Sequence, residues 1–386
     1  MISARQFNLA CEAFKVRRGG DYLSFAESVT HASSTAGDAA KCCRLALSGR
    51  NRLDEQNRCL RVDCTNGDSL ALMLRDGVRI EAFAEVVNRV HFVCVNVGVA
   101  SALWHLNLSI WTHSRFFQLL EKVSDETLLS TESVERPIPR GLEGPCVYAK
   151  GLVSTQDRLK WVQPAVRFLE NAPQRMQGFR RSYMASLTWC WLHEVGHVLK
   201  GHTSQALDEF FPLSSLEIDE EAGFSLTREA RLLAEMEADA YASSSLLVPT
   251  LRLNRRTSDR TIRDVAVITG TTAVTLLLSG VEDALGTTNF VRRHPPVWYR
   301  ALQLSRIANS AFSRDEFPVT NRTLSDLSHL HHFFGDQLAA TKSPHAISVA
   351  EQFRADVRKN AGDALEYFKQ RRTTIAPQEP PAPLAD

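Results

Sequence analysis

The sequence predicts an α+β fold, in which a smaller N-terminal α/β region precedes a larger, mainly helical region. Residues 58–64 and 69–75 are two strand-like runs, and the Asn66-Gly67 pair between them is typical of a β-hairpin turn. Residues 90–97 are almost wholly apolar, which indicates a buried strand. From about residue 156 onward, apolar residues recur at three- and four-residue spacings, as on the buried faces of helices.

Two helices are expected beside these strands. Apolar residues from Phe7 to Phe14 have helical spacing, and a second helical pattern runs from Val99 to Lys122, after Gly98.

The chain of 386 residues is long enough for more than one domain. We expect an N-terminal region of unknown role over 1–132 and a linker over 133–155, where proline and glycine gather. The larger domain then spans 156–372, and the proline-rich tail 373–386 is expected to be disordered.

Composition excludes some classes of partner and location. The chain is 44% hydrophobic and 23% charged with a net charge of +1, so nothing indicates nucleic acid or an acidic membrane surface. The eight cysteines form no C-x-x-C pair, and the first residues lack a secretion signal, so we expect reduced thiols in the cytoplasm. Residues 265–280 are uncharged but shorter than the about 20 residues of a spanning helix, which favours a buried core helix over a membrane segment.

The most informative pattern is His193-Glu194-Val195-Gly196-His197, which fits H-E-x-x-H. Apolar spacing predicts a helix from about Arg180 to Lys200, with Gly201 as its stop. Histidines four apart lie on one helix face, so both rings can bind one zinc ion. Glu194 can then act as general base on a zinc-bound water.

A catalytic zinc takes three protein ligands and keeps one position open. A second predicted helix, which Thr227 begins as N-cap, carries Glu235 and Asp239 on one face. Glu235 can be the third ligand, and Asp239 can fix a zinc-bound histidine through its other ring nitrogen. Glu237 points away from that face, so no ligand role is assigned to it.

The motif set resembles that of the gluzincin metallopeptidases. His193-Glu194-x-x-His197 followed by Glu235-x-x-Ala238-Asp239 is most similar to the M48 type, and His294-Pro295…Arg300 resembles that type's later His-Pro…Arg element. The resemblance covers about residues 180–304 and implies a zincin-like domain with one zinc ion. A soluble relative is implied, of an M48-like or a phage-exclusion (Lit-like) kind, because no long transmembrane helices are evident.

Several side chains keep two interpretations. His294 can stabilise the oxyanion of a tetrahedral intermediate, or it can cap a helix that starts at the prolines after it. Arg300 is more simply a structural partner, for instance of Asp239, than a catalytic group. His202 suits a cation at the helix C-terminus, and Cys190 suits a buried apolar thiol better than a ligand. The cluster His329, His331 and His332 suits a solvated role better than a second metal site.

The sequence therefore predicts a zinc-dependent endopeptidase acting on a protein or peptide substrate, with the metal ligands His193, His197 and Glu235. In a Lit-like variant of this hypothesis, it cuts one host or phage protein and stays inactive until triggered. The alternative is a catalytically silent, zinc-stabilised binding or regulatory module, although such a module needs no general base. Oligomeric state is not encoded in any of these patterns.

Overall fold

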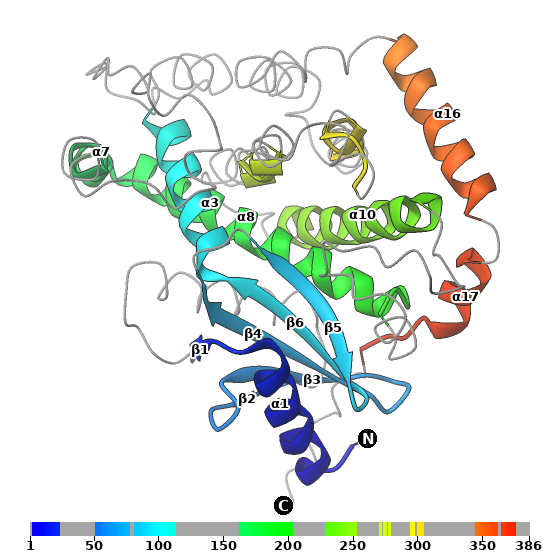
Figure 1. The fold of residues 1–386 in the computed structure, drawn as a ribbon. Helices are drawn as coiled ribbons and strands as arrows, with labels where there is room; N and C mark the ends of the chain where they lie inside the picture. Colours follow the sequence, from blue (N-terminus) through cyan, green and yellow to red (C-terminus); the bar gives the residue numbers. More distant parts are fainter. Residues whose placement is uncertain are drawn as a thin grey trace, which may run out of the picture.

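The computed structural model describes residues 2–23, 51–77, 81–112, 162–203, 228–252, 344–361 and 364–375, with shorter pieces within 270–278 and 294–304. A mixed sheet lies beside a layer of long helices (Figure 1). The strands are β1 (Asp21–Leu23), β2 (Asn51–Asp54), β3 (Cys59–Asp63), β4 (Ser69–Asp76), β5 (Ala82–Val87) and β6 (Val90–Asn96). The helices are α1 (Ala4–Arg18), α3 (Val97–Trp111), α7 (Gln163–Glu170), α8 (Pro173–Leu199), α10 (Arg228–Arg252), α16 (Pro344–Asn360) and α17 (Ala364–Arg371).

The strands are ordered β2-β3-β4-β6-β5, and β1 also pairs with β4. β3 and β4 form the predicted antiparallel hairpin, with Gly67 at φ 83° in its turn. β5 and β6 form a second hairpin through Asn88 and Arg89, which both adopt the left-handed conformation that two-residue turns favour. Among the described strands, the one parallel pairing joins β4 to β6, so β5 lies outside β6.

Successive residues of β4 point to opposite faces of the sheet, and both faces are buried. Leu70, Leu72 and Leu74 belong to the core shared with α3 and α8, whereas Ala71 and Met73 belong to the core under α1. The sheet is therefore a middle layer between α1 and the helices that carry the site (Figure 1).

The three predicted strands are confirmed, but β1, β2 and β5 were not predicted. The longest of these is β5. Its pattern is interrupted by Glu85, which is almost fully buried and pairs with Arg18 and, at 2.9 Å, with Arg17 of α1. Burial of a paired carboxylate hides a strand from a search for apolar residues.

The first helix is longer than the expected stretch from Phe7 to Phe14. The second begins directly after β6 and ends at Trp111, short of the expected Lys122. Thr112 closes its last turn, because both its N–H and its hydroxyl donate to the carbonyl of Leu108.

α8 and α10 pack closely and cross at Gly196. A Cβ at Gly196 would lie 3.0 Å from the Cα of Ala238, so the missing side chain permits the approach of the two helices. α10 begins at Arg228 as predicted, while α8 begins at Pro173, earlier than the expected Arg180. The crossing brings the H-E-x-x-H face of α8 against the Glu235 face of α10.

The expected core helix over 265–280 is confirmed for its described residues, which are helical and buried, with Val274 and Leu277 among them. None of the helices in the described part combines the length and apolar content that a membrane crossing requires.

The expected disorder from residue 373 onward is wrong for its first three residues. Thr373 is buried, the N–H of Thr65 donates to the carbonyl of Thr374, and Ile375 forms a β-bridge with Cys64. The expected linker 133–155 and the three histidines at 329, 331 and 332 lie outside the described residues.

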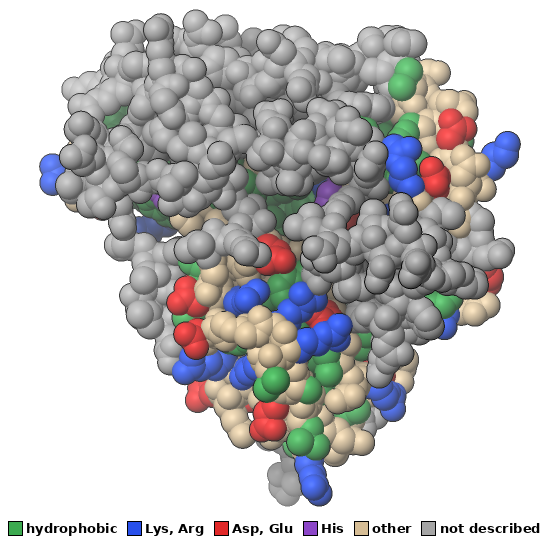
Figure 2. Space-filling model, viewed as in Figure 1, with side chains coloured by type: hydrophobic (Ala, Val, Ile, Leu, Met, Phe, Trp, Pro, Cys, Tyr) green, Lys and Arg blue, Asp and Glu red, His purple; other side chains and the backbone are tan. Residues whose placement is uncertain are grey.

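Basic and acidic side chains are interspersed on the visible described surface around α1 (Figure 2). This mixture agrees with the net charge of +1 and forms no continuous basic face there.

Candidate metal centre

Both histidines of the motif lie on the face of α8 that meets α10. They are one helical turn apart, and their Nε2 atoms are 3.2 Å from each other. His193 is buried and His197 nearly so, which is costly for two unpaired imidazoles unless further groups complete their contacts.

Glu235 of α10 supplies the third donor. Its Oε2 lies 3.5 Å from Nε2 of His193, and its Oε1 lies 3.4 Å from Nε2 of His197. A tetrahedral zinc ion with bonds of about 2.0–2.1 Å holds its ligand atoms about 3.3–3.4 Å apart. The distances from the two nitrogens to each other and to the nearer carboxylate oxygen are therefore of the size that a small tetrahedral cation needs. These residues form the one group of this kind among the described residues.

Charge favours the ionised form of Glu235. Burial alone raises the pKa of this carboxyl, but His294 and His193 hold the pKa well below its ordinary value. The donor set thus offers an anionic oxygen, as a divalent cation requires.

Behind His193 lies a buried ion pair. Nδ1 of His193 is 2.9 Å from Oδ1 of Asp239, although the oxygen lies off the N–H direction, so the contact is not a linear hydrogen bond. Arg300 grips the same carboxylate with two hydrogen bonds, of 2.7 Å from Nε and 2.5 Å from Nη2. Arg300 is thus a partner of Asp239, as the sequence suggested.

These charges are strongly coupled. Burial by itself lowers the pKa of His193, but Asp239 and Glu235 raise it to about 10. Burial raises the pKa of Asp239, but Arg300 and His193 outweigh it and lower that pKa.

Behind His197 lies His202, and the expectation of a cation at the helix end is wrong. His202 is only 3% exposed, and its burial lowers its pKa to about 4, so the ring is neutral near pH 7. Its Nδ1 lies 3.2 Å from Nδ1 of His197, and its Nε2 lies 3.2 Å from Oε2 of Glu237.

Glu237 is outside the donor group, in agreement with the sequence. It nevertheless reaches the site through His202, a contact that sequence reasoning missed. The signal that could have placed His202 beside His197 is Gly201. A glycine after a helix commonly forms a Schellman turn, which brings the next residue back onto the last helical turn.

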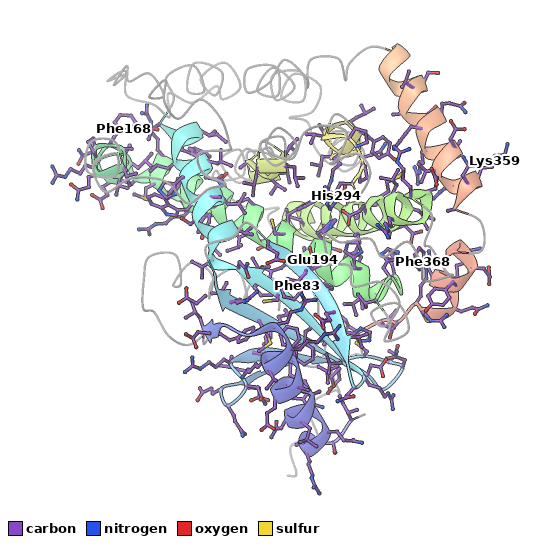
Figure 3. The ribbon with its side chains drawn as sticks, in the orientation of Figure 1. Phe83, Phe168, Glu194, His294, Lys359 and Phe368 are labelled. Atoms are coloured by element: carbon purple, nitrogen blue, oxygen red, sulfur yellow. The ribbon has the colours of Figure 1, made fainter. Side chains whose placement is uncertain are left out.

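Glu194 lies on the part of α8 that packs on β5 and β6 (Figure 3). It is buried, and burial raises the pKa of its carboxyl, an effect that His193 and His197 oppose. Like Glu235 it is close to the two histidines, yet it is not a member of the donor set.

His294 approaches the donor set from another part of the chain (Figure 3). Its Nδ1 is 3.1 Å from Oε2 of Glu235, and its side chain is 38% exposed. Helical structure follows Pro295 and Pro296, so both of the interpretations from the sequence remain compatible with its position.

Cys190 lies one turn before His193 but is not in the donor group. Burial raises the pKa of its thiol to about 12, so it stays protonated, as expected for an apolar core cysteine.

Comparison with known families supports a peptidase. Residues 95–313 match the family Peptidase U49, and this segment contains all seven predicted site residues. No curated protein and no solved structure shows a significant match to the chain. Because the family match covers more than half of the 386 residues, this chain belongs to the peptidase U49 family.

Proposed function

We propose that this chain is a zinc-dependent endopeptidase in which His193, His197 and Glu235 hold the ion and Glu194 is the general base. The observation that carries the proposal is the convergence of two imidazole nitrogens and one carboxylate: the Nε2 atoms of His193 and His197 are 3.2 Å apart, and each lies within 3.5 Å of an oxygen of Glu235. Membership of a peptidase family makes a protein or peptide the substrate.

When bound, zinc would supply a Lewis acid that polarises the scissile carbonyl and makes water more acidic. The carboxylate of Glu194 would take a proton from the attacking water and return it to the leaving nitrogen. Its place beside the first histidine, outside the donor set, suits a base better than a ligand. Asp239, held by Arg300, would fix the ring of His193.

The finer assignments belong to the same proposal. A zincin-like architecture is supported by the H-E-x-x-H helix packed against both the sheet and α10. The family match favours a peptidase and is compatible with a Lit-like relation, while an M48-like specificity rests on the sequence motifs alone.

We assign His294 the role of an oxyanion donor, because it adjoins the donor set yet keeps a partly exposed side chain. Removal of such a donor costs about 10²–10³-fold in turnover.

The test compares wild type with Glu194→Gln, measuring bound zinc by elemental analysis and cleavage of a denatured protein substrate. We expect about one zinc per chain in both proteins and no cleavage by the variant. His294→Ala should keep zinc and lose turnover only in part. Wild-type protein with less than about a tenth of an equivalent of zinc would exclude the proposed site. Zinc without cleavage in the wild type would instead favour the silent zinc-stabilised module.

A further inference from the structure

The C-terminal end of α8 turns a second histidine back onto a proposed ligand. Gly201 adopts φ 78°, the N–H of His202 donates to the carbonyl of His197 at 2.8 Å, and the N–H of Gly201 donates to that of Val198 at 3.0 Å. These two bonds define a Schellman turn, in which the residue after the glycine packs against the residue at the start of the last turn. Local backbone geometry thus sets His202 beside His197.

The far side of His202 is held by the C-terminal segment, residues 368–375. Glu237 accepts from Nε2 of His202, and Arg372 donates to both oxygens of Glu237, at 3.0 and 3.3 Å. Phe368 lies on α17 (Figure 3). Its ring meets the His202 ring edge-on, with centroids 4.7 Å apart. The N–H of Thr373 donates to the carbonyl of Leu199, which ties the segment to the end of α8.

Glu237, His202 and His197 form a row of hydrogen-bonding groups. Chemistry decides which nitrogen of each ring carries the hydrogen. An ionised carboxylate only accepts, so the hydrogen of His202 lies on Nε2, towards Glu237. A neutral imidazole carries one hydrogen, so with that hydrogen on Nε2 the Nδ1 of His202 is an acceptor, and it faces Nδ1 of His197 at 3.2 Å. His197 must then carry its own hydrogen on Nδ1, so the lone pair of its Nε2 faces Glu235 and His193.

We infer that His202 is a positioning residue: it fixes the tautomer and ring orientation in which His197 offers Nε2 to a metal, and Glu237 with Arg372 holds His202 in place. His202 has this role towards a metal only if the proposed zinc site exists. The partners of a ligand's outer nitrogen commonly change metal affinity by about 10–100-fold.

The test measures zinc affinity of the full chain by competition with a chromophoric chelator. His202→Leu removes the acceptor and should weaken zinc binding about 10–100-fold. His202→Gln retains a carbonyl acceptor and should recover most of the affinity. Val198→Ala, at a buried apolar position of the same turn, is the matched control and should bind zinc as wild type does.

A second readout needs neither metal nor variant. Nitrogen chemical shifts of ¹⁵N-histidine in zinc-free wild type should show His197 protonated at Nδ1 and not at Nε2. His197 protonated at Nε2 overturns the inference, as does a His202→Leu protein with the affinity of Val198→Ala, or a glutamine variant no better than the leucine variant. Wild-type protein without zinc affinity overturns the proposed function instead, whatever the tautomer.

Discussion

The two histidines of the motif are supported by groups of different chemistry. Behind His193 stands a buried ion pair, Asp239 with Arg300, in which both side chains are nearly inaccessible to solvent. Behind His197 stands a neutral ring, His202, and charge enters only at the rim through Glu237 and Arg372, whose side chain is 40% exposed. Both rows, Asp239 with Arg300 and His202 with Glu237 and Arg372, can leave a lone pair on the Nε2 that faces the donor set. They differ in how much stability is lost when one member is removed.

The difference arises from desolvation. A buried ion pair stabilises little overall, yet removal of one partner strands a charge in a medium that solvates it poorly. A rim pair is screened by water and salt, so its loss costs little. The His193 side should therefore govern stability, and the His197 side should govern mainly the orientation of one ligand.

The largest effect is expected from Asp239→Ala. It leaves the guanidinium of Arg300 buried with Glu235, 3.7 Å away, as the one remaining anionic partner in the described part of the chain. We expect a loss of about 3–5 kcal/mol in the free energy of unfolding, measured by urea denaturation of zinc-free protein. The control is Asp239→Leu combined with Arg300→Met, which should recover much of that loss but not the zinc affinity. A loss below about 1 kcal/mol would mean that the pair behaves as a surface pair.

An intermediate effect is expected from Gly196→Ala, which affects both rows together. Alanine is intrinsically about 1 kcal/mol better than glycine inside a helix. The new Cβ would nevertheless meet the Cα of Ala238 at 3.0 Å and push α10 from α8. We expect a net loss of about 1–3 kcal/mol by thermal or urea unfolding, with weaker zinc binding. A gain in stability would show that the two helices can separate freely.

The smallest effect is expected from Arg372→Ala. Its pair with Glu237 is at the rim, so unfolding should change by less than about 1 kcal/mol. Zinc affinity should fall by less than about fivefold. The difference should shrink in roughly 0.5 M salt, because the Debye length is then only about 4–5 Å. An effect as large as that of Asp239→Ala would remove the contrast between the two rows. Lys369→Ala, in an exposed pair with Glu366, is the matched control.

Local sequence signals predicted the parts of the site that lie on single helices. Four-residue spacing placed His193 with His197 and Glu235 with Asp239, and the structure brings these pairs together across the α8–α10 crossing. Gly196, which permits that crossing, could be noticed in the sequence, but its neighbour Ala238 could not be named from it.

Long-range packing explains what was missed. The neutrality of His202 depends on burial by Phe368, 166 positions along the chain, so a helix-end rule could not reveal it. β5 was hidden because the charge of Glu85 is met by arginines of α1. The parallel pairing of β4 with β6 likewise requires knowledge of which strand lies at the edge.

The C-terminal segment that carries Arg372 is tied to the sheet by the bridge between Ile375 and Cys64, and it follows α8 and α10 in the chain. This order has a consequence for biosynthesis. A ribosome makes residue 372 after the helices that bear the three donors, so a nascent chain can assemble those donors while the outer half of the row behind His197 is still missing. Cleavage of the chain just before residue 372 by another enzyme would return the molecule to that unfinished state.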